Sequence, residues 1–255
     1  MNDIRVEHDG GVTVIVMNRP ERHNAVDGPM AAELVSAFRE FEHSDAKVAV
    51  LAGDGPSFCA GANLKAVGTD DGNKLNLEGD GPMGPTRMNL SKPVVAAING
   101  HAVAGGLELA IWCDMRVADD DAILGVFCRR WGVPLIDGGT VRLPRLIGHS
   151  RAMDLILTGR PVDAAEALSF GLVNRVVPSG TVRAAAVALA HDIARMPQTC
   201  MRNDRRSARD QWGDDEESAL RREFAIGMSS LMADGVGGAA RFAAGKGRGG
   251  SFDDI

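Results

Sequence analysis

Several features that would assign this chain to a particular class of protein are missing. Its four cysteines form no CxxC pair and no zinc-type spacing with histidine, so neither a disulfide framework nor a metal site is predicted. No apolar run reaches the roughly 18 residues of a membrane span, and no basic-then-apolar leader opens the chain. The formal charge of -6 disfavours a nucleic-acid partner. We therefore expect a cytoplasmic protein that binds neither membrane nor nucleic acid.

The 255 residues carry short buried strands that alternate with helices. β-branched runs flank Asp9-Gly10-Gly11, which predicts a hairpin. Apolar residues at helical spacing predict a helix over Pro29–Phe41, and Val48–Leu51 follows as a short buried strand. The same alternation of strands and helices continues, with strands expected at Val94–Ile98, Met115–Ala118 and Ile123–Val126 and a helix from about Gly106 to Trp112. This alternation favours an α/β fold, a spiral of ββα units.

The chain changes character after Pro178, where strand signals end. Helices are predicted at Val182–Ala194, Glu216–Leu231 and Gly237–Ala244. We expect a core over residues 1–195 that carries the active site and a helical oligomerisation region over 196–255. Gly245–Gly250 matches G-x-G-x-x-G, but no strand precedes it, which argues against a dinucleotide oxidoreductase.

Two glycine- and alanine-rich segments carry the clearest chemical signal. Ser57–Lys65 follows a buried strand, and its small residues would let a ligand approach the backbone closely. Ser91–Ala110 reads as a strand, a glycine-rich turn and a helix whose first turn contains Glu108. Backbone N–H groups at a helix start are unpaired and favour an anion. A third segment, Gly68–Pro85, is rich in glycine and is expected to be a mobile surface loop that covers a ligand.

Both segments resemble the two signature stretches of the enoyl-CoA hydratase/isomerase (crotonase) family, and further matches run from Asn18-Arg19-Pro20 to Pro178. The resemblance implies a crotonase-like ββα spiral that binds acyl-coenzyme A thioesters. It places the two N–H groups of the family's oxyanion hole on Ala62 and Gly105. It also implies a coenzyme A site, for which we predict Arg22, His23, Ala25, Ala60, Ala62, Leu64 and Gly105.

Glu108 occupies the position of one of the two catalytic glutamates of the family's hydratases. The α-protons of a thioester become acidic only when the enolate oxygen is stabilised, which N–H donors can do, and a carboxylate can then move the proton. The alternative for Glu108 is a carboxylate that only complements the helix dipole.

The family's second glutamate falls on Cys128, twelve residues before Thr140. A thiol with its ordinary pKa near 8.5 is a poor proton donor to carbon at neutral pH, so we interpret Cys128 as a small buried apolar residue. Asp137 is the candidate for the missing carboxylate, because the resemblance includes enzymes with an aspartate within one residue of this position. It could equally be the N-cap of a helix beginning near Gly138, and the two roles are compatible.

The predicted function is hydration of a trans-2-enoyl-CoA, with double-bond isomerisation by a single carboxylate as one alternative and non-catalytic acyl-CoA binding as another. No cofactor is expected, because coenzyme A is part of the substrate. The resemblance, together with Leu220, Phe224, Met228 and Leu231 at helical spacing, implies a homotrimer or a dimer of trimers. The acyl chain and the pathway stay open.

Overall fold

The computed structural model describes residues 3–252 of the chain. The chain divides into two compact units between Ala194 and Arg195. Each unit is described by itself.

The first unit is built on a six-stranded sheet in the order β1-β2-β3-β4-β6-β9. Its strands are β1 (Ile4–Asp9), β2 (Val12–Met17), β3 (Val48–Gly53), β4 (Val94–Ile98), β6 (Met115–Asp119) and β9 (Arg175–Val177). The β1–β2 hairpin is antiparallel, as predicted, and the other strands pair in parallel. A smaller sheet joins β5 (His101–Val103), β7 (Ile123–Gly125) and β8 (Val162–Asp163).

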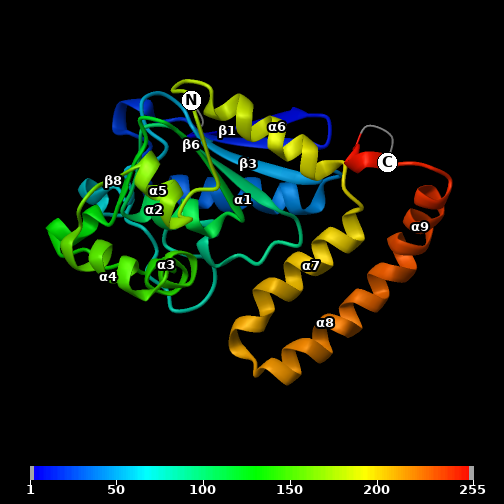
Figure 1. The fold of residues 1–255 in the computed structure, drawn as a ribbon. Coiled ribbons are helices and arrows are strands. Elements are labelled where there is room, and N and C mark those ends of the chain that lie inside the picture. The colour runs from blue at the N-terminus through cyan, green and yellow to red at the C-terminus, as the bar shows by residue number, and fades with distance from the viewer. Residues whose placement is uncertain (1–2, 253–255) are drawn as a thin grey trace. The chain divides into compact units, whose positions relative to one another are not determined.

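Helices cover both faces of the large sheet, which explains why three of its inner strands, β2, β3 and β4, are almost entirely apolar. On one face, Ile15 and Leu51 pack in the core that includes α1 (Gly28–His43). On the other face, Val14 and Val50 pack with α6 (Val182–Ala194). Figure 1 shows these two helices on opposite sides of the strands. Successive side chains of a strand point to opposite faces, so a strand covered on both sides has no polar face.

The remaining helices of this unit surround the smaller sheet. They are α2 (Gly105–Trp112), α3 (Gly139–Ile147), α4 (His149–Thr158) and α5 (Ala164–Phe170). The predicted helices and strands at Pro29–Phe41, Val48–Leu51, Val94–Ile98, Gly106–Trp112, Met115–Ala118 and Ile123–Val126 are all present, and each of their ends lies within two residues of the predicted one.

The second unit is helical, with α7 (Gln198–Asp210), α8 (Glu216–Ser230) and α9 (Val236–Ala243). The last two are joined by a π-helical turn at Leu231–Gly235, so they run on as one long rod (Figure 1). In the described part of the chain, no helix is long and apolar enough to cross a membrane.

The prediction of a surface loop over Gly68–Pro85 is wrong for its last five residues. Residues 68–80 are exposed or half-buried, but residues 81–86 are all buried. Two glycines of this part allow close packing: a Cβ on Gly81 would lie 1.9 Å from Thr86 Oγ1, and one on Gly84 would lie 2.7 Å from the carbonyl oxygen of Ala31. Here glycine reflects tight packing of the backbone, not freedom to move.

Candidate active site

The two predicted backbone donors lie side by side. A Cβ placed on Gly61 would come within 3.0 Å of the Gly105 nitrogen, and one on Gly106 would come within 2.1 Å of the Cys59 carbonyl oxygen. The segment is held by bridges that pair Val26 with Ala62 and Cys59 with Ala102. The small residues of both segments therefore bring the Ala62 turn against the start of α2.

Neither of these two N–H groups donates a hydrogen bond to any residue that the structure describes, whereas the Asn63 N–H beside them donates to the Val26 carbonyl at 2.8 Å. Gly105 is the first residue of α2, so its N–H has no partner within the helix. Ala104, just before it, has a φ of +54°, an unusual value for a residue with a Cβ. Such backbone strain is typical of functional sites.

Glu108 is buried on the first turn of α2, with 2% of its surface exposed. Its Oε1 accepts hydrogen bonds from the N–H of Asp137 at 2.9 Å and of Gly139 at 2.7 Å. Its other carboxylate oxygen accepts none from the described residues. Burial, with the charge of Asp137 adding to it, raises the pKa of Glu108 to about 7, although the two N–H donors oppose the shift. A base with this pKa can exchange protons near neutral pH.

Asp137 does not cap a helix. Helix α3 begins at Gly139 with Gly138 at its N-cap and no side-chain cap bond, so the N-cap alternative is wrong. The physical reason is that the carboxylate points elsewhere: its Oδ1 accepts the Met83 N–H at 2.9 Å and the Thr86 hydroxyl. Burial raises the pKa of Asp137, although these hydrogen bonds oppose the shift. A catalytic role for this carboxylate stays a prediction.

Cys128 lies in a 3₁₀ turn, Phe127–Trp131, and packs in the main core with 6% of its surface exposed. Burial raises the pKa of its thiol, and the charge of Glu108 raises it further. A protonated thiol beside Glu108 has the character of a buried apolar side chain. This agrees with the interpretation of Cys128 from the sequence.

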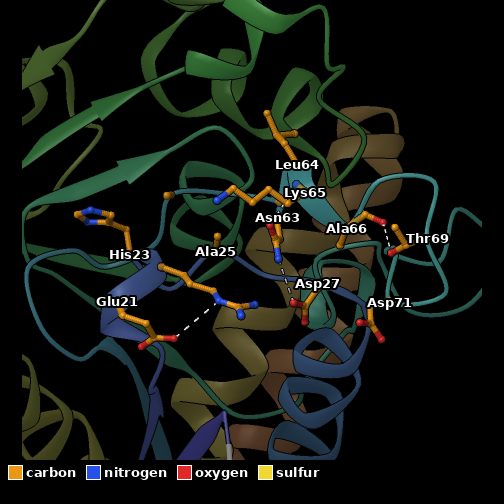
Figure 2. Close-up of a pocket in the computed structure, with 13 residues that line it drawn as sticks. Glu21, His23, Ala25, Asp27, Asn63, Leu64, Lys65, Ala66, Thr69 and Asp71 are labelled. Carbon is orange, nitrogen blue, oxygen red and sulfur yellow. Dashed lines mark hydrogen bonds and ion pairs between the residues drawn. The ribbon is translucent and has the colours of Figure 1, made fainter.

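A cavity of about 700 Å³ opens against the Ala62 turn. Its lining includes six of the residues predicted for coenzyme A, namely Arg22, His23, Ala25, Ala60, Ala62 and Leu64. Gly105, Glu108 and Asp137 do not line it. Figure 2 labels His23, Ala25 and Leu64 among the lining residues, together with the polar side chains of Asn63 and Lys65. The sequence therefore predicted the floor of this cavity but not its polar rim.

A buried polar network supports the cavity floor. Asp27 accepts hydrogen bonds from Arg19 at 2.7 Å and from Asn63 at 3.2 Å, and Arg19 also donates to the Ala25 carbonyl at 2.5 Å (Asp27 and Asn63 in Figure 2). Burial raises the pKa of Asp27, but the hydrogen bonds from Arg19 and Asn63 outweigh it and bring the pKa below its usual value. Arg19, Asp27 and Asn63 were not predicted as site residues, because no motif marks them and Asn63 meets Asp27 from 36 residues away in the sequence.

The described residues contain no group of three or more His, Cys, Asp or Glu side chains that could hold a metal ion. The site brings together two backbone donors and two buried carboxylates, Glu108 and Asp137, whose pKa values are raised by burial, and the cavity lies against the turn that carries Ala62.

This fold, an α/β core followed by a helical C-terminal part, is the crotonase fold. The chain belongs to the enoyl-CoA hydratase/isomerase family, whose model matches residues 7–231. It is 34% identical over 241 residues to enoyl-CoA hydratase EchA19 of Mycobacterium tuberculosis, which covers 91% of this chain and 90% of that protein. It is 35% identical over 192 residues to the mevalonyl-coenzyme A hydratase sidH of Aspergillus fumigatus, covering 72% of this chain and 69% of that protein.

Solved structures agree. The crystal structure of enoyl-CoA hydratase EchA1 from Mycobacterium marinum matches with a TM-score of 0.90 and 30% identity, over 96% of each chain. The fold and the family are thus established for this chain, and the resemblance read from its two signature segments is confirmed.

Proposed function

We propose that this protein adds water to the double bond of trans-2-enoyl-CoA thioesters. The observation that carries the proposal is Glu108: a buried carboxylate with a pKa raised to about 7, on the helix that begins with the unpaired Gly105 N–H. The names of the relatives, enoyl-CoA hydratase EchA19 among them, support hydration. The acyl group differs between relatives, as the mevalonyl-coenzyme A hydratase illustrates.

In the proposed mechanism the cavity beside Ala62 binds the coenzyme A moiety, and the thioester oxygen accepts hydrogen bonds from the N–H groups of Ala62 and Gly105. Preorganised donors of this kind contribute about 3–4 kcal/mol each to stabilising a developing oxyanion. Glu108 removes a proton from water as the water oxygen bonds to C3, and electrons move onto the thioester oxygen. The same carboxyl group then returns a proton to C2. The sum is the addition of one water molecule.

Isomerisation is the second candidate, and Cys128 favours it. With a thiol in place of the second glutamate, and with the carboxylate of Asp137 held by Met83 and Thr86, Glu108 is the carboxylate left to transfer the proton. A single carboxylate can remove a proton from C4 and return it to C2, which moves the double bond and needs no water.

The deciding experiment is a panel of trans-2- and trans-3-enoyl-CoA thioesters incubated with the protein and analysed by mass. Hydration adds the mass of one water molecule, whereas isomerisation leaves the mass unchanged and alters only the chromatographic retention. A protein that binds the thioesters in calorimetry but changes none of them would be a non-catalytic acyl-CoA binder and would overturn the proposal.

We propose in addition that the protein assembles as a trimer or a dimer of trimers. Four apolar side chains of the second unit, Leu220, Phe224, Met228 and Leu231, recur along α8 and its continuation and are 42–71% exposed. Partner copies of the chain would cover such a stripe. Light scattering at micromolar concentration should give a mass of three or six chains, and Phe224→Glu should lower it. A monomer mass for the unmodified protein would contradict the proposal.

A further inference from the structure

The buried segment at residues 81–86 is fastened by one carboxylate. Oδ1 of Asp137 accepts the N–H of Met83 and the hydroxyl of Thr86. Arg142 strengthens the attachment, because it donates to the Thr86 carbonyl at 2.6 Å and to the Asp137 carbonyl at 2.9 Å. Gly81 leaves the room that this arrangement requires, since a Cβ there would lie 2.8 Å from the same Oδ1.

The side chain of Met83 lies against Gly105. A Cβ built on Gly105 would be 2.8 Å from Met83 Sδ and 3.0 Å from its Cγ and Cε, and Met83 is only 1% exposed. Gly105 carries one of the two proposed carbonyl donors. A thioester whose oxygen accepts a hydrogen bond from that N–H has its first acyl carbons two or three bonds from the oxygen, and this brings them close to the residue against which Met83 packs.

We propose that Asp137 is a positioning residue, which fixes Met83 beside Gly105 so that Met83 limits the acyl group that the site accepts. The inference rests on the proposed binding of acyl-CoA thioesters and adds the element that selects among them.

The charge of Asp137 suits this role. Hydrogen bonds to an ionised acceptor are roughly twice as strong as those between neutral groups. The backbone N–H of the same residue donates to Glu108 Oε1 at 2.9 Å. Asp137 therefore links the segment that contains Met83 to Glu108, the carboxylate that we propose for proton transfer. Asp137 is buried, with 3% of its surface exposed. Its side chain is positioned by the hydrogen bonds from Met83 and Thr86 and does not cap α3.

The test measures how tightly butyryl-CoA and octanoyl-CoA bind, by calorimetry. Both are saturated thioesters, so they bind without undergoing the proposed hydration. The ratio of their dissociation constants therefore measures only how the site selects the length of the acyl group. Met83→Ala removes most of the side chain that limits the acyl group. We expect this change to favour octanoyl-CoA over butyryl-CoA by at least about fivefold in the ratio of dissociation constants, because one methylene in an apolar pocket changes affinity by roughly 10-fold or more.

Asp137→Asn and Thr86→Val weaken the attachment and should move the ratio in the same direction. Thr86→Ser keeps the hydroxyl and should leave the ratio within about twofold of the unmodified protein. Should Asp137→Asn fail to fold, the Thr86→Val and Thr86→Ser pair decides the question, since it alters the same hydrogen bond without touching the carboxylate.

Two results would overturn the inference. One is an unchanged ratio in folded Met83→Ala or Thr86→Val protein. The other is an Asp137→Asn protein that keeps the ratio but turns over every chain length more slowly by the same factor, with an altered pH profile, because that behaviour belongs to an acid or base. Failure of the proposed hydration is read separately, from the turnover of crotonyl-CoA by the unmodified protein.

Discussion

Replacing Glu108 by glutamine is expected to lower kcat on crotonyl-CoA at least about a hundredfold, the usual scale for a positioned acid or base. Glutamine keeps a carbonyl oxygen that can accept the N–H groups of Asp137 and Gly139, so the local backbone should stay in place. What is lost is the capacity to take up and return a proton. The dissociation constant of a saturated acyl-CoA should change little, because the backbone of the cavity is intact.

Glu166 provides the matched control. It also lies in the first turn of a helix, α5, but pairs with Arg160 near the surface, away from the candidate site residues. Glu166→Gln should leave kcat within about twofold of the unmodified protein. If Glu108→Gln behaves the same way, Glu108 is only a carboxylate at a helix start and the proposed mechanism fails.

The pH dependence of kcat/KM is a second test of the role of Glu108. Because burial and the charge of Asp137 raise the pKa of Glu108 to about 7, the base form is lost as the pH falls below 7. The kcat/KM of the unmodified protein should therefore fall about tenfold per pH unit on the acid side. The residual rate of Glu108→Gln should lack this limb.

Stability should show the opposite trend. A carboxyl group whose pKa is raised by folding stabilises the fold in its neutral form, fully below its unfolded pKa near 4.5, and this contribution is lost as the pH rises through about 7. The unmodified protein should therefore lose stability relative to Glu108→Gln between pH 4.5 and 8, by at most about 3 kcal/mol. Urea unfolding of the two proteins across this range measures the difference.

Much of the fold could be predicted because its elements carry strong local signals. β4 is a run of five buried apolar residues, and α2 follows a glycine turn, so both were placed within one residue of their observed ends. Helix α7 gave no such signal. Its sequence is almost entirely polar, and its described residues are all exposed or half-buried, so it has no apolar stripe from which a helical period could be read.

The segments that line the cavity could be predicted from the sequence, whereas contacts between segments distant in sequence could not. Ala62, Gly105 and Glu108 stand within recognisable segments, and the cavity lies where the resemblance placed coenzyme A. By contrast, Met83 packs against Gly105 from a segment that was predicted to be a loop because it is rich in glycine and poor in large apolar residues. For the carboxylate of Asp137 the sequence offered a catalytic role or an N-cap on the adjacent helix, and the cap was considered because capping is a local interaction. Its actual partners, Met83 and Thr86, are more than fifty residues away in sequence.

The oxyanion donor at Gly105 can be tested by removing its N–H, and the structure shows which control this requires. Any residue larger than glycine places a Cβ within 3.0 Å of Met83, so a loss of rate in Gly105→Pro alone would mix a steric effect with the lost donor. Gly105→Ala adds the same Cβ and keeps the N–H. Proline is tolerated in the first position of a helix, which is where Gly105 stands, so both proteins should fold.

We expect kcat of Gly105→Pro to lie a further hundredfold to thousandfold below that of Gly105→Ala, which corresponds to the roughly 2.7–4 kcal/mol that one oxyanion donor supplies. Repeating the pair in a Met83→Ala background removes most of the steric contact, so the alanine protein should regain activity while the proline protein does not. Steady-state kinetics on crotonyl-CoA measure the difference, and thermal unfolding confirms that the two folds are equally stable. Equal kcat values for the proline and alanine proteins in both backgrounds would show that the Gly105 N–H does not bind the thioester oxygen, and the donor would then have to be sought elsewhere on the turn that contains Ala62.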